Sequence, residues 1–519
     1  MPNFSPNHRV HKPVVRSRGG VVASQHVGAA RIGAQILTEG GNAVDAAVAT
    51  SFALGVLEPW MSGIGGGGMM IVRHADGKVD TVDFGMRAPA ALALADYPLA
   101  EGEANDLFAW PAVQKDSNMT GPLSIAVPGV VDGLGVAYGA WGSKPWANLL
   151  APAVNLAHQG LSVDWYATLM IAQCAGGLAK WPASADRFLP SGHPPPIPMA
   201  PTATSRLPME SLAKTLDTLM RNGPRAFYEG PLAERIAAES QALGSSLSAQ
   251  DLAAYHAQIL KPLCISYRDA KIWATPELTA GPTLAHVLRN HEEFQNLQSG
   301  PDTEWYLSLV NSLQTAYTKR LAEMGDINGG RDIGCTTHFT IADRDGTIVT
   351  LTQTLLSVFG SMVTLPETGI LMNNGIFWFD PRKDNPNSLA PSKRCLSNMC
   401  PVVVERADGA VFGIGASGGR RIMPAVAQIA AFTTDFCMDL EDALHCPRID
   451  VSGTGLVLAD SDLPEVVVNA LASQFKTNVK KRTVYPSWFA NISAVQVEAR
   501  DRIGGTEPTL PWADAVTEI

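Results

Sequence analysis

The stretch GCTTHFTIADRDGTIVTLTQTL, residues 334–355, consists of two runs that alternate between apolar and polar residues, separated by a tight-turn signal. That signal is Asp345-Gly346, a pair typical of two-residue β-hairpin turns, and the flanking runs have the period of two that strands show. We therefore predict an antiparallel hairpin here. Other strand-like and helical segments recur along the chain, which predicts an α/β (α+β) fold of layered sheets covered by helices.

Two threonines, Thr336 and Thr337, stand at the head of this predicted hairpin. A hydroxyl nucleophile needs a base, and His338 would share a strand face with Thr336. We interpret His338 as a packed or surface histidine rather than as that base. A second arrangement needs no histidine. If the chain is cut before Thr336, the new α-amine has a pKa of about 7.7–8 and becomes the base for the hydroxyl beside it.

A glycine-rich segment, GIGGGG at residues 63–68, fits the dinucleotide-binding pattern GxGxxG. That interpretation requires a strand before the glycines and a helix after them. Here the runs MMIVRH and KVDTVDF flank Asp76-Gly77, which predicts a second β-hairpin instead. We therefore exclude a Rossmann site and expect the glycines to allow close backbone packing or close approach of a ligand.

Composition and charge limit the class of partner. The 519 residues are 46% hydrophobic and 17% charged, which is typical of a globular protein with a large core. A net charge of -10 argues against nucleic acid and anionic membrane surfaces as partners. Residues 1–20 contain no apolar signal core, so we expect a cytoplasmic location. The seven cysteines are dispersed without a CxxC pair, which predicts free thiols.

Helical periodicity recurs in several segments. Asn42 is a capping residue before an apolar run that reads as a buried helix rather than a membrane span. Residues 145–270 are predicted to be mainly helical. Further helices are expected over about 147–159, 209–221, 232–243, 302–324 and 422–437.

Several motifs occur in an order that resembles the γ-glutamyltranspeptidase family of N-terminal-nucleophile hydrolases. Besides the 334–355 hairpin, they are the segment from VVASQH to GIGGGG (21–68), VPGVVDGL (127–134), LSAQDLAAY (247–255), KRCLSNMCP (393–401) and ASGGRRI (416–422). The resemblance covers nearly the whole chain. It implies a four-layer αββα sandwich and a self-processing enzyme that acts on a small-molecule amide substrate, with no cofactor and no metal.

The resemblance also implies where the chain is cut. Autocleavage is expected between Cys335 and Thr336, giving a large subunit of residues 1–335 and a small subunit of residues 336–519. The two subunits are expected to remain associated as one intertwined unit. Thr336 is then the nucleophile of both the processing step and the catalytic step.

Three further residues take roles through the resemblance. Thr354, at the far end of the hairpin, is expected to hydrogen-bond near the amine and the hydroxyl of Thr336. Gly418 and Gly419 are expected to supply the backbone N–H groups of an oxyanion hole, since glycines let such donors approach a developing oxyanion closely. Without the resemblance, Gly418-Gly419 would be interpreted as an ordinary turn.

The sequence departs from the family pattern where the acyl group is recognised. Gly85 stands where the family has an arginine for the substrate carboxylate, and Arg87, two residues on, is a candidate replacement. The family's Ser-Ser pair becomes Ser397-Asn398, and both residues still offer hydrogen-bonding groups. These three residues, Arg87, Ser397 and Asn398, are the expected substrate-binding residues.

The side that recognises the substrate's α-ammonium departs further. Polar or acidic family positions correspond to Leu356, Gly375 and Trp378, and none of these offers an acceptor oxygen on its side chain. Two enzyme functions remain open: a hydrolase or transferase of γ-glutamyl amides, and an amidohydrolase of acyl groups without an α-amine, such as oxamate-like, glutaryl or cephalosporin-like amides. A third interpretation is an uncut, catalytically silent binding protein.

Overall fold

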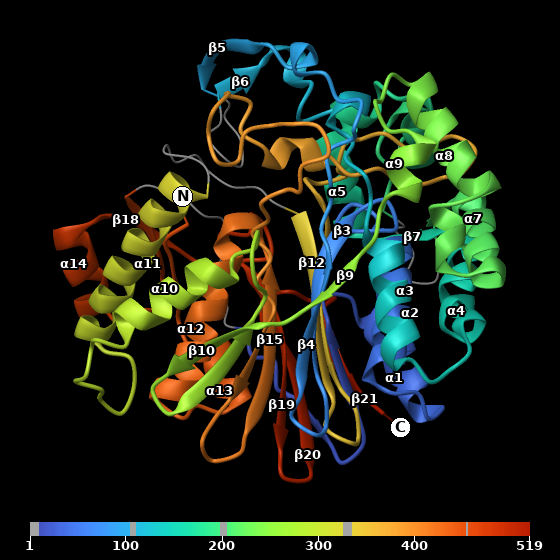
Figure 1. The fold of residues 1–519 in the computed structure, drawn as a ribbon. Helices are drawn as coiled ribbons and strands as arrows, with labels where there is room; N and C mark the ends of the chain where they lie inside the picture. The colour runs from blue at the N-terminus through green and yellow to red at the C-terminus, as the bar shows by residue number, and fades with distance from the viewer. Residues whose placement is uncertain (1–9, 104–110, 198–204, 325–334, 453–454, 519) are drawn as a thin grey trace.

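The computed structural model describes residues 10–103, 111–197, 205–324, 335–452 and 455–518. At its centre two seven-stranded sheets pack face to face, and helices cover the outer side of each sheet (Figure 1). The expected four-layer αββα sandwich and the α/β (α+β) class are confirmed.

The two sheets combine strands from distant parts of the sequence. The first has the order β1-β20-β19-β15-β14-β11-β10, with strands Val15–Ser17, Asp501–Thr506, Asn491–Glu498, Val411–Ser417, Val402–Glu405, Ala270–Ala274 and Leu263–Tyr267. The second has the order β21-β2-β12-β13-β3-β4-β9, with strands Asp514–Thr517, Val21–Ser24, Cys335–Ala342, Ile348–Leu356, Gly67–Arg73, Val79–Phe84 and Gln258–Leu260.

Helices form the two outer layers. On the second sheet, α1, α2 and α3 pack against the strands, α4 packs on α2, and α7 packs on α4. On the first sheet, α12 and α13 pack against the strands, with α11 outside α10. From α1 to α7 the helices are Val27–Thr38, Ala43–Leu57, Val130–Trp141, Trp146–Gln159, Trp165–Leu178, Pro182–Phe188 and Glu210–Asn222. From α8 to α14 they are Pro231–Ala242, Ala249–Ala253, Gly281–His291, Thr303–Glu323, Ile422–Asp435, Leu440–His445 and Glu465–Gln474.

Short strands form three smaller sheets. The described residues between 145 and 270 are mainly helical, as predicted, with six α-helices. They also contain strands that the sequence did not reveal, because runs of three to five residues are too short to establish alternation. The smaller sheets pair β5 with β6, β7 with β8, and β17 with β16 and β18. Their strands are Leu99–Glu103, Pro111–Val113, Leu161–Val163, Ser205–Leu207, Ile449–Asp450, Leu456–Asp460 and Lys476–Lys480.

The predicted hairpin at 334–355 forms β12 and β13, in the middle of the second sheet. One face of β12 packs into the core beneath α2 through Phe339 and Ile341. The opposite face meets the first sheet, where the Thr340 hydroxyl donates to the Ser493 carbonyl at 3.2 Å. The central strands are therefore buried on both faces, which explains the apolar and threonine-rich sequence.

The start of α2 is fixed to this hairpin. Asn42 caps the helix as predicted, since its side chain accepts from the N–H groups of Val44 and Asp45. The Ala43 N–H donates to the Asp343 carboxylate, 3.0 Å away, just after β12 ends. The apolar helix that follows is almost entirely buried.

Candidate active site

Thr336 lies at the head of β12, where the pairing with β13 is irregular. Cys335 is opposite Leu356 and Thr337 is opposite Gln353, so β13 contains one extra residue across from Thr336. Such β-bulges bend a strand and redirect a side chain. Cys335 and Thr336 are joined within β12, so the structure is that of the uncut chain.

Thr354 occupies the bulge and contacts Thr336. The Thr336 hydroxyl lies 3.4 Å from the Thr354 hydroxyl oxygen, which also accepts from the Leu356 N–H at 2.8 Å. Leu356 itself has a φ of 86°, in the left-handed region that strains a branched side chain. The two threonines that the sequence places eighteen residues apart are thus brought together.

The glycine-rich segment packs behind Thr354. A Cβ on Gly66 would lie 2.2 Å from the Thr354 carbonyl oxygen, and one on Gly68 would lie 2.3 Å from the Phe84 ring. The strand β3 begins within these glycines, at Gly67, where a dinucleotide site needs a helix, so the exclusion of a Rossmann site is confirmed. Their function here is close backbone packing.

A small pocket opens beside Thr336. Its lining combines two predicted site residues, Asn398 and Gly419, with Thr336 itself and an apolar wall. The remaining residues are Leu356, Trp378, Met399 and Ile422. Leu356 and Trp378 are two of the positions at which the sequence departs from the family pattern.

The Gly418-Gly419 turn joins β15 to α12 at the edge of this pocket. Both glycines have positive φ, 134° and 61°, a conformation that side chains disfavour. A Cβ on Gly418 would also lie 3.1 Å from the Ala490 Cα. The hydroxyl of Tyr317, which the sequence analysis missed, holds the turn by donating to the Arg420 carbonyl at 2.6 Å.

The 397–398 segment, Ser397-Asn398, lies in an extended loop beside Thr336. The Ser397 side chain is buried, and its hydroxyl has no hydrogen-bond partner among the described residues. Arg320, also missed by the sequence analysis, donates to the Ser397 carbonyl at 2.9 Å and to the Asn398 side-chain oxygen at 3.2 Å. Burial lowers the pKa of Arg320 to about 10.

Arg87 lies outside the pocket lining. Its backbone bridges Val127 and Arg394, and its guanidinium lies over the Tyr255 ring, 5.7 Å from the ring centre. Arg394 pairs with Asp83 and, at 3.0 Å, with Glu277.

The space beside Gly375 is filled by neighbouring side chains, among them the Asn373 amide oxygen, which a Cβ on Gly375 would approach to 3.0 Å. A Cβ at this position would lie 2.8 Å from the Ala126 Cβ and 2.9 Å from the Met86 sulfur. No side chain fits there without movement of a neighbour. The absence of a polar side chain at this position is therefore matched by the surrounding packing.

His338 is packed between the sheets, as interpreted from the sequence. Its Nδ1 lies 2.8 Å from the Thr352 hydroxyl and its Nε2 lies 2.9 Å from the Thr340 hydroxyl. Burial lowers its pKa to about 3. The histidine therefore stays neutral and bonded to threonines of the two hairpin strands.

The segment GASGG, 415–419, has the GxSxG spacing of a serine nucleophile elbow and lies between a strand and a helix. The Ser417 hydroxyl accepts from the Gln25 side-chain amide at 2.5 Å. The ring of His338 packs against Gly415 but bonds to threonines, so no serine–histidine pair forms. This match does not make a triad.

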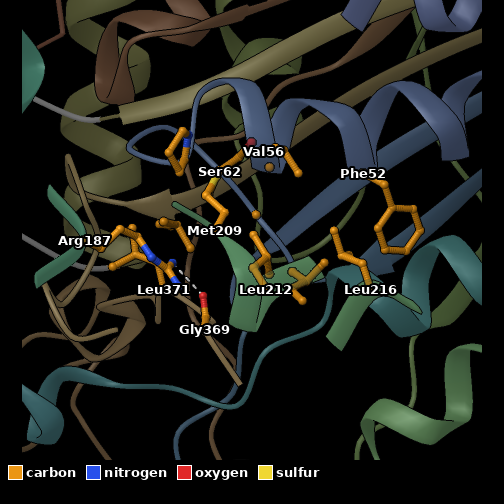
Figure 2. A pocket seen from close by; sticks show the side chains of 14 residues that line it. Phe52, Val56, Ser62, Arg187, Met209, Leu212, Leu216, Gly369 and Leu371 are labelled. Atoms are coloured by element: carbon orange, nitrogen blue, oxygen red, sulfur yellow. Dashed lines mark hydrogen bonds between the residues drawn. The ribbon is translucent and has the colours of Figure 1, made fainter. Parts of the chain in front are cut away.

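A second pocket lies apart from Thr336, among α2, α7 and the loop at 369–371 (Figure 2). Its wall is largely aliphatic and aromatic, with Phe52, Leu212 and Leu216 among the lining residues. Arg187 points across its mouth and donates to the Gly369 carbonyl at 2.7 Å. Thr336 and Thr354 do not line this pocket, and we interpret it as a packing defect of the core.

The described residues contain neither a candidate metal site nor a membrane-spanning helix. Among them, no cluster of three or more His, Cys, Asp and Glu side chains is arranged to hold a metal ion. No helix in the described part of the chain is both long and apolar enough to span a bilayer. The six cysteines whose side chains are described are free thiols.

Comparison with known proteins extends these observations. The Gamma-glutamyltranspeptidase family profile matches residues 29–334 and 329–515. An acylase ACY 1 proenzyme of Pseudomonas sp. (strain SE83) is 32% identical over 505 residues, covering 89% of this chain and 88% of that protein. A glutathione hydrolase proenzyme of Bacillus subtilis (strain 168) is 29% identical over 550 residues, covering 94% and 89%.

Solved structures agree with the sequence comparison. The crystal structure of cephalosporin acylase from Bacillus halodurans matches with a TM-score of 0.83 and 25% identity, over 99% of this chain and 98% of that chain. Helicobacter pylori gamma-glutamyltranspeptidase matches with a TM-score of 0.53 and 29% identity, over 60% and 86%. The chain therefore belongs to the gamma-glutamyltranspeptidase family of N-terminal-nucleophile hydrolases.

Proposed function

We propose that this chain is a proenzyme that cuts itself between Cys335 and Thr336 and then hydrolyses or transfers an acyl group from an amide. The observation that carries the proposal is the position of Thr336. It lies at the head of a buried strand, 3.4 Å from the Thr354 hydroxyl, in one pocket with Gly419 and Asn398.

The proposed cut uses the Thr336 hydroxyl as nucleophile. Its oxygen attacks the carbonyl carbon of Cys335, the peptide nitrogen leaves as an amine, and an ester links the two residues. Water then hydrolyses the ester. The products are residues 1–335, ending in a carboxylate, and residues 336–519, beginning with a free α-amine.

In each later turnover the α-amine acts as the base. It takes the proton from the Thr336 hydroxyl, which attacks the substrate carbonyl, while N–H groups of Gly418 and Gly419 stabilise the oxyanion. The intermediate collapses, and the leaving amine takes the proton from the α-ammonium. Water or an acceptor amine then releases the acyl group from Thr336. Thr354 keeps the nucleophile oriented.

We propose that the preferred acyl group has no α-amine. An ammonium needs acceptor oxygens, but the pocket wall around Thr336 includes Leu356 and Trp378, whose side chains carry none. The space at Gly375 is already filled by Ala126, Met86 and the Asn373 amide oxygen, which accepts from the Gly375 N–H. Sites that leave a substrate's charged group without partners reject that substrate strongly. The similarity to acylases supports the same assignment.

The polar end of the acyl group is assigned to Ser397 and Asn398. Asn398 lines the pocket, and the buried Ser397 hydroxyl lacks a partner among the described residues. Arg87 is proposed to reach the far end of the acyl group from its position over Tyr255, beyond the pocket lining.

A γ-glutamyl donor is the second candidate, supported by the similarity to a glutathione hydrolase. Glutaryl and γ-glutamyl p-nitroanilides differ only in the α-amine and form a matched pair of substrates. We expect kcat/KM to be at least tenfold higher for the glutaryl compound, since a buried, unpartnered charge costs about 1–3 kcal/mol or more. A preference for the γ-glutamyl compound contradicts the assignment of Leu356, Gly375 and Trp378.

The cut itself is tested on a denaturing gel and by mass spectrometry. Wild-type protein should give two bands, with the smaller beginning at Thr336, and Thr336→Ala should give one full-length band and no turnover. Thr337→Ala is the matched control, because that hydroxyl is also buried on β12 but lies outside the pocket. An active wild-type protein that stays in one piece contradicts the mechanism; an inactive one supports the silent binding protein.

A further inference from the structure

The C-terminal end of α11 reaches the two segments that border Thr336, which are the 397–398 segment and the Gly418-Gly419 turn. Tyr317 and Arg320 are three residues apart, so they project from the same side of the helix. The Tyr317 hydroxyl donates to the Arg420 carbonyl at 2.6 Å, beside Gly419. The Arg320 guanidinium donates to the Ser397 carbonyl at 2.9 Å and to the Asn398 side-chain oxygen at 3.2 Å.

Arg320 is an unusual residue for this place. Its side chain is only 6% exposed, and none of the described carboxylates pairs with it. Its other contacts are the Thr279 carbonyl at 2.9 Å and the Thr283 hydroxyl at 3.1 Å. A buried charge without a counter-charge costs stability, and an apolar side chain would fill the same space without that cost. The contacts with the 397–398 segment therefore indicate a function other than packing.

We propose that the end of α11 positions both walls of the Thr336 pocket, with Arg320 holding the 397–398 segment and Tyr317 holding the Gly418-Gly419 turn. Both are positioning residues, since they act through Asn398 and through the Gly418-Gly419 turn. The inference rests on the proposed function, in which the 397–398 segment and the Gly418-Gly419 turn contact the substrate.

The two contacts predict different kinetic effects. Asn398 is proposed to bind the acyl group in the ground state and in the transition state alike, so loosening the 397–398 segment should raise KM. Gly419 is proposed to bind the oxyanion, which exists only in the transition state, so loosening its turn should lower kcat. A role limited to stability would not divide the two constants in this way.

These contacts also cross the proposed cut. Helix α11 belongs to residues 1–335, whereas the 397–398 segment and the Gly418-Gly419 turn belong to residues 336–519. The large subunit would therefore build part of the small subunit's active site without touching the reacting atoms.

The test compares Tyr317→Phe, Arg320→Gln and Arg320→Lys with Tyr306→Phe. Tyr306 is the matched control, because it is buried on the same helix. Its hydroxyl donates to the Pro447 carbonyl at 2.7 Å, away from the 397–398 segment and the Gly418-Gly419 turn. Turnover of glutaryl p-nitroanilide is normalised to the amount of cut Thr336 terminus measured by mass spectrometry.

We expect Tyr317→Phe to lower kcat about three- to tenfold at nearly constant KM, the range for loss of one hydrogen bond. Arg320→Gln should raise KM about tenfold with kcat within twofold, and Arg320→Lys should recover part of that loss because lysine retains a cationic donor. Tyr306→Phe should match the wild type in both constants. Equal effects of Tyr317→Phe and Tyr306→Phe, or lower thermal stability with unchanged kcat and KM, would overturn the proposal.

Hydrogen–deuterium exchange separates this proposal from the proposed function. Peptides covering 395–401 and 417–423 should exchange faster in Arg320→Gln and in Tyr317→Phe respectively, and not in Tyr306→Phe. If the wild type turns over no amide, the proposed function fails, while faster exchange in these peptides still supports the positioning contacts. Unchanged exchange in both peptides overturns them whatever the activity.

Discussion

Thr354 is the residue placed to orient the proposed nucleophile, Thr336. The bulge in β13 directs it toward Thr336, and the Leu356 N–H bonds to its oxygen. That bond fixes where the hydroxyl sits, because an oxygen that accepts from a backbone N–H has little freedom to rotate away. In a regular extended strand, successive side chains point to opposite faces, so the bulge is what lets Thr354 face Thr336.

Replacement of Thr354 should impair catalysis without preventing folding. Thr354→Ala removes one hydroxyl that contacts the proposed nucleophile, and we expect kcat to fall about 10- to 100-fold, as for loss of a hydrogen bond to a reacting group. Thr354→Ser retains the hydroxyl and should keep kcat within about threefold. Steady-state kinetics of the cut protein measures both; equal losses in the two variants contradict a role for the hydroxyl.

The sequence could single out these candidate residues but not their geometry. Thr336, Thr354 and the Gly418-Gly419 pair follow from motifs in the expected order. The bulge that joins the threonines depends on one extra residue in β13, which changes no local propensity. Arg87 was selected by its distance along the chain from Gly85, and chain distance does not show that its guanidinium lies over Tyr255.

Among the elements, the β12–β13 hairpin combines a proposed catalytic end with a structural middle. Its middle carries His338, which bonds to Thr352 on the paired strand and packs against Gly415 of the facing sheet. A Cβ on Gly415 would lie 2.2 Å from the histidine ring, so the two residues fit only as a pair. The hairpin is thereby fixed between both sheets below the pocket.

The buried histidine should make stability depend on pH. Its folded-state pKa of about 3 lies below the ordinary value of 6.5. Between these two pH values only the unfolded chain binds the proton. The contribution of the neutral histidine to stability is therefore complete above pH 6.5 and is lost as the pH falls toward 3. His338→Gln should flatten the decline in unfolding free energy between pH 6.5 and 4.5 by about 1 kcal/mol per pH unit. Urea titrations across that range measure the slope; identical slopes contradict the assignment.

Helix α11 illustrates what periodicity can and cannot reveal. The helix was predicted at 302–324 and spans Thr303–Glu323. Its buried residues Leu313, Ala316 and Tyr317 follow helical spacing, and Arg320 continues the same side. A charged residue on an apolar stripe was a usable signal. The partners of Arg320 in the 397–398 segment were not predictable, because they belong to residues 336–519, after the proposed cut.

At the scale of the whole molecule, the two proposed subunits are interleaved. In the second sheet, β12 and β13 of residues 336–519 lie between β2 and β3 of residues 1–335. In the first sheet, β14 pairs with β11, so strands of both segments again share one ladder. Separating the segments would break both sheets and expose the cores between the layers.

The cut chain should therefore behave as one particle. After cleavage we expect residues 1–335 and 336–519 to elute together in size-exclusion chromatography, with the mass of the intact chain or a multiple of it. The segments should separate only at denaturant concentrations that also abolish the circular dichroism signal, because hydrogen bonds and apolar surface join them in both sheets. Elution of a folded small segment alone contradicts this arrangement.

The crowding at Gly375 limits how substrate preference can be redesigned. Introducing an aspartate there, to attract an amino acid donor, would drive its first carbon into Ala126 and Met86. The change would require smaller residues at both neighbours in the same variant, so a path of single substitutions passes through a poorly packed protein. Selection for glutamyl chemistry would have to begin at Met86 or Ala126, before any charge is added.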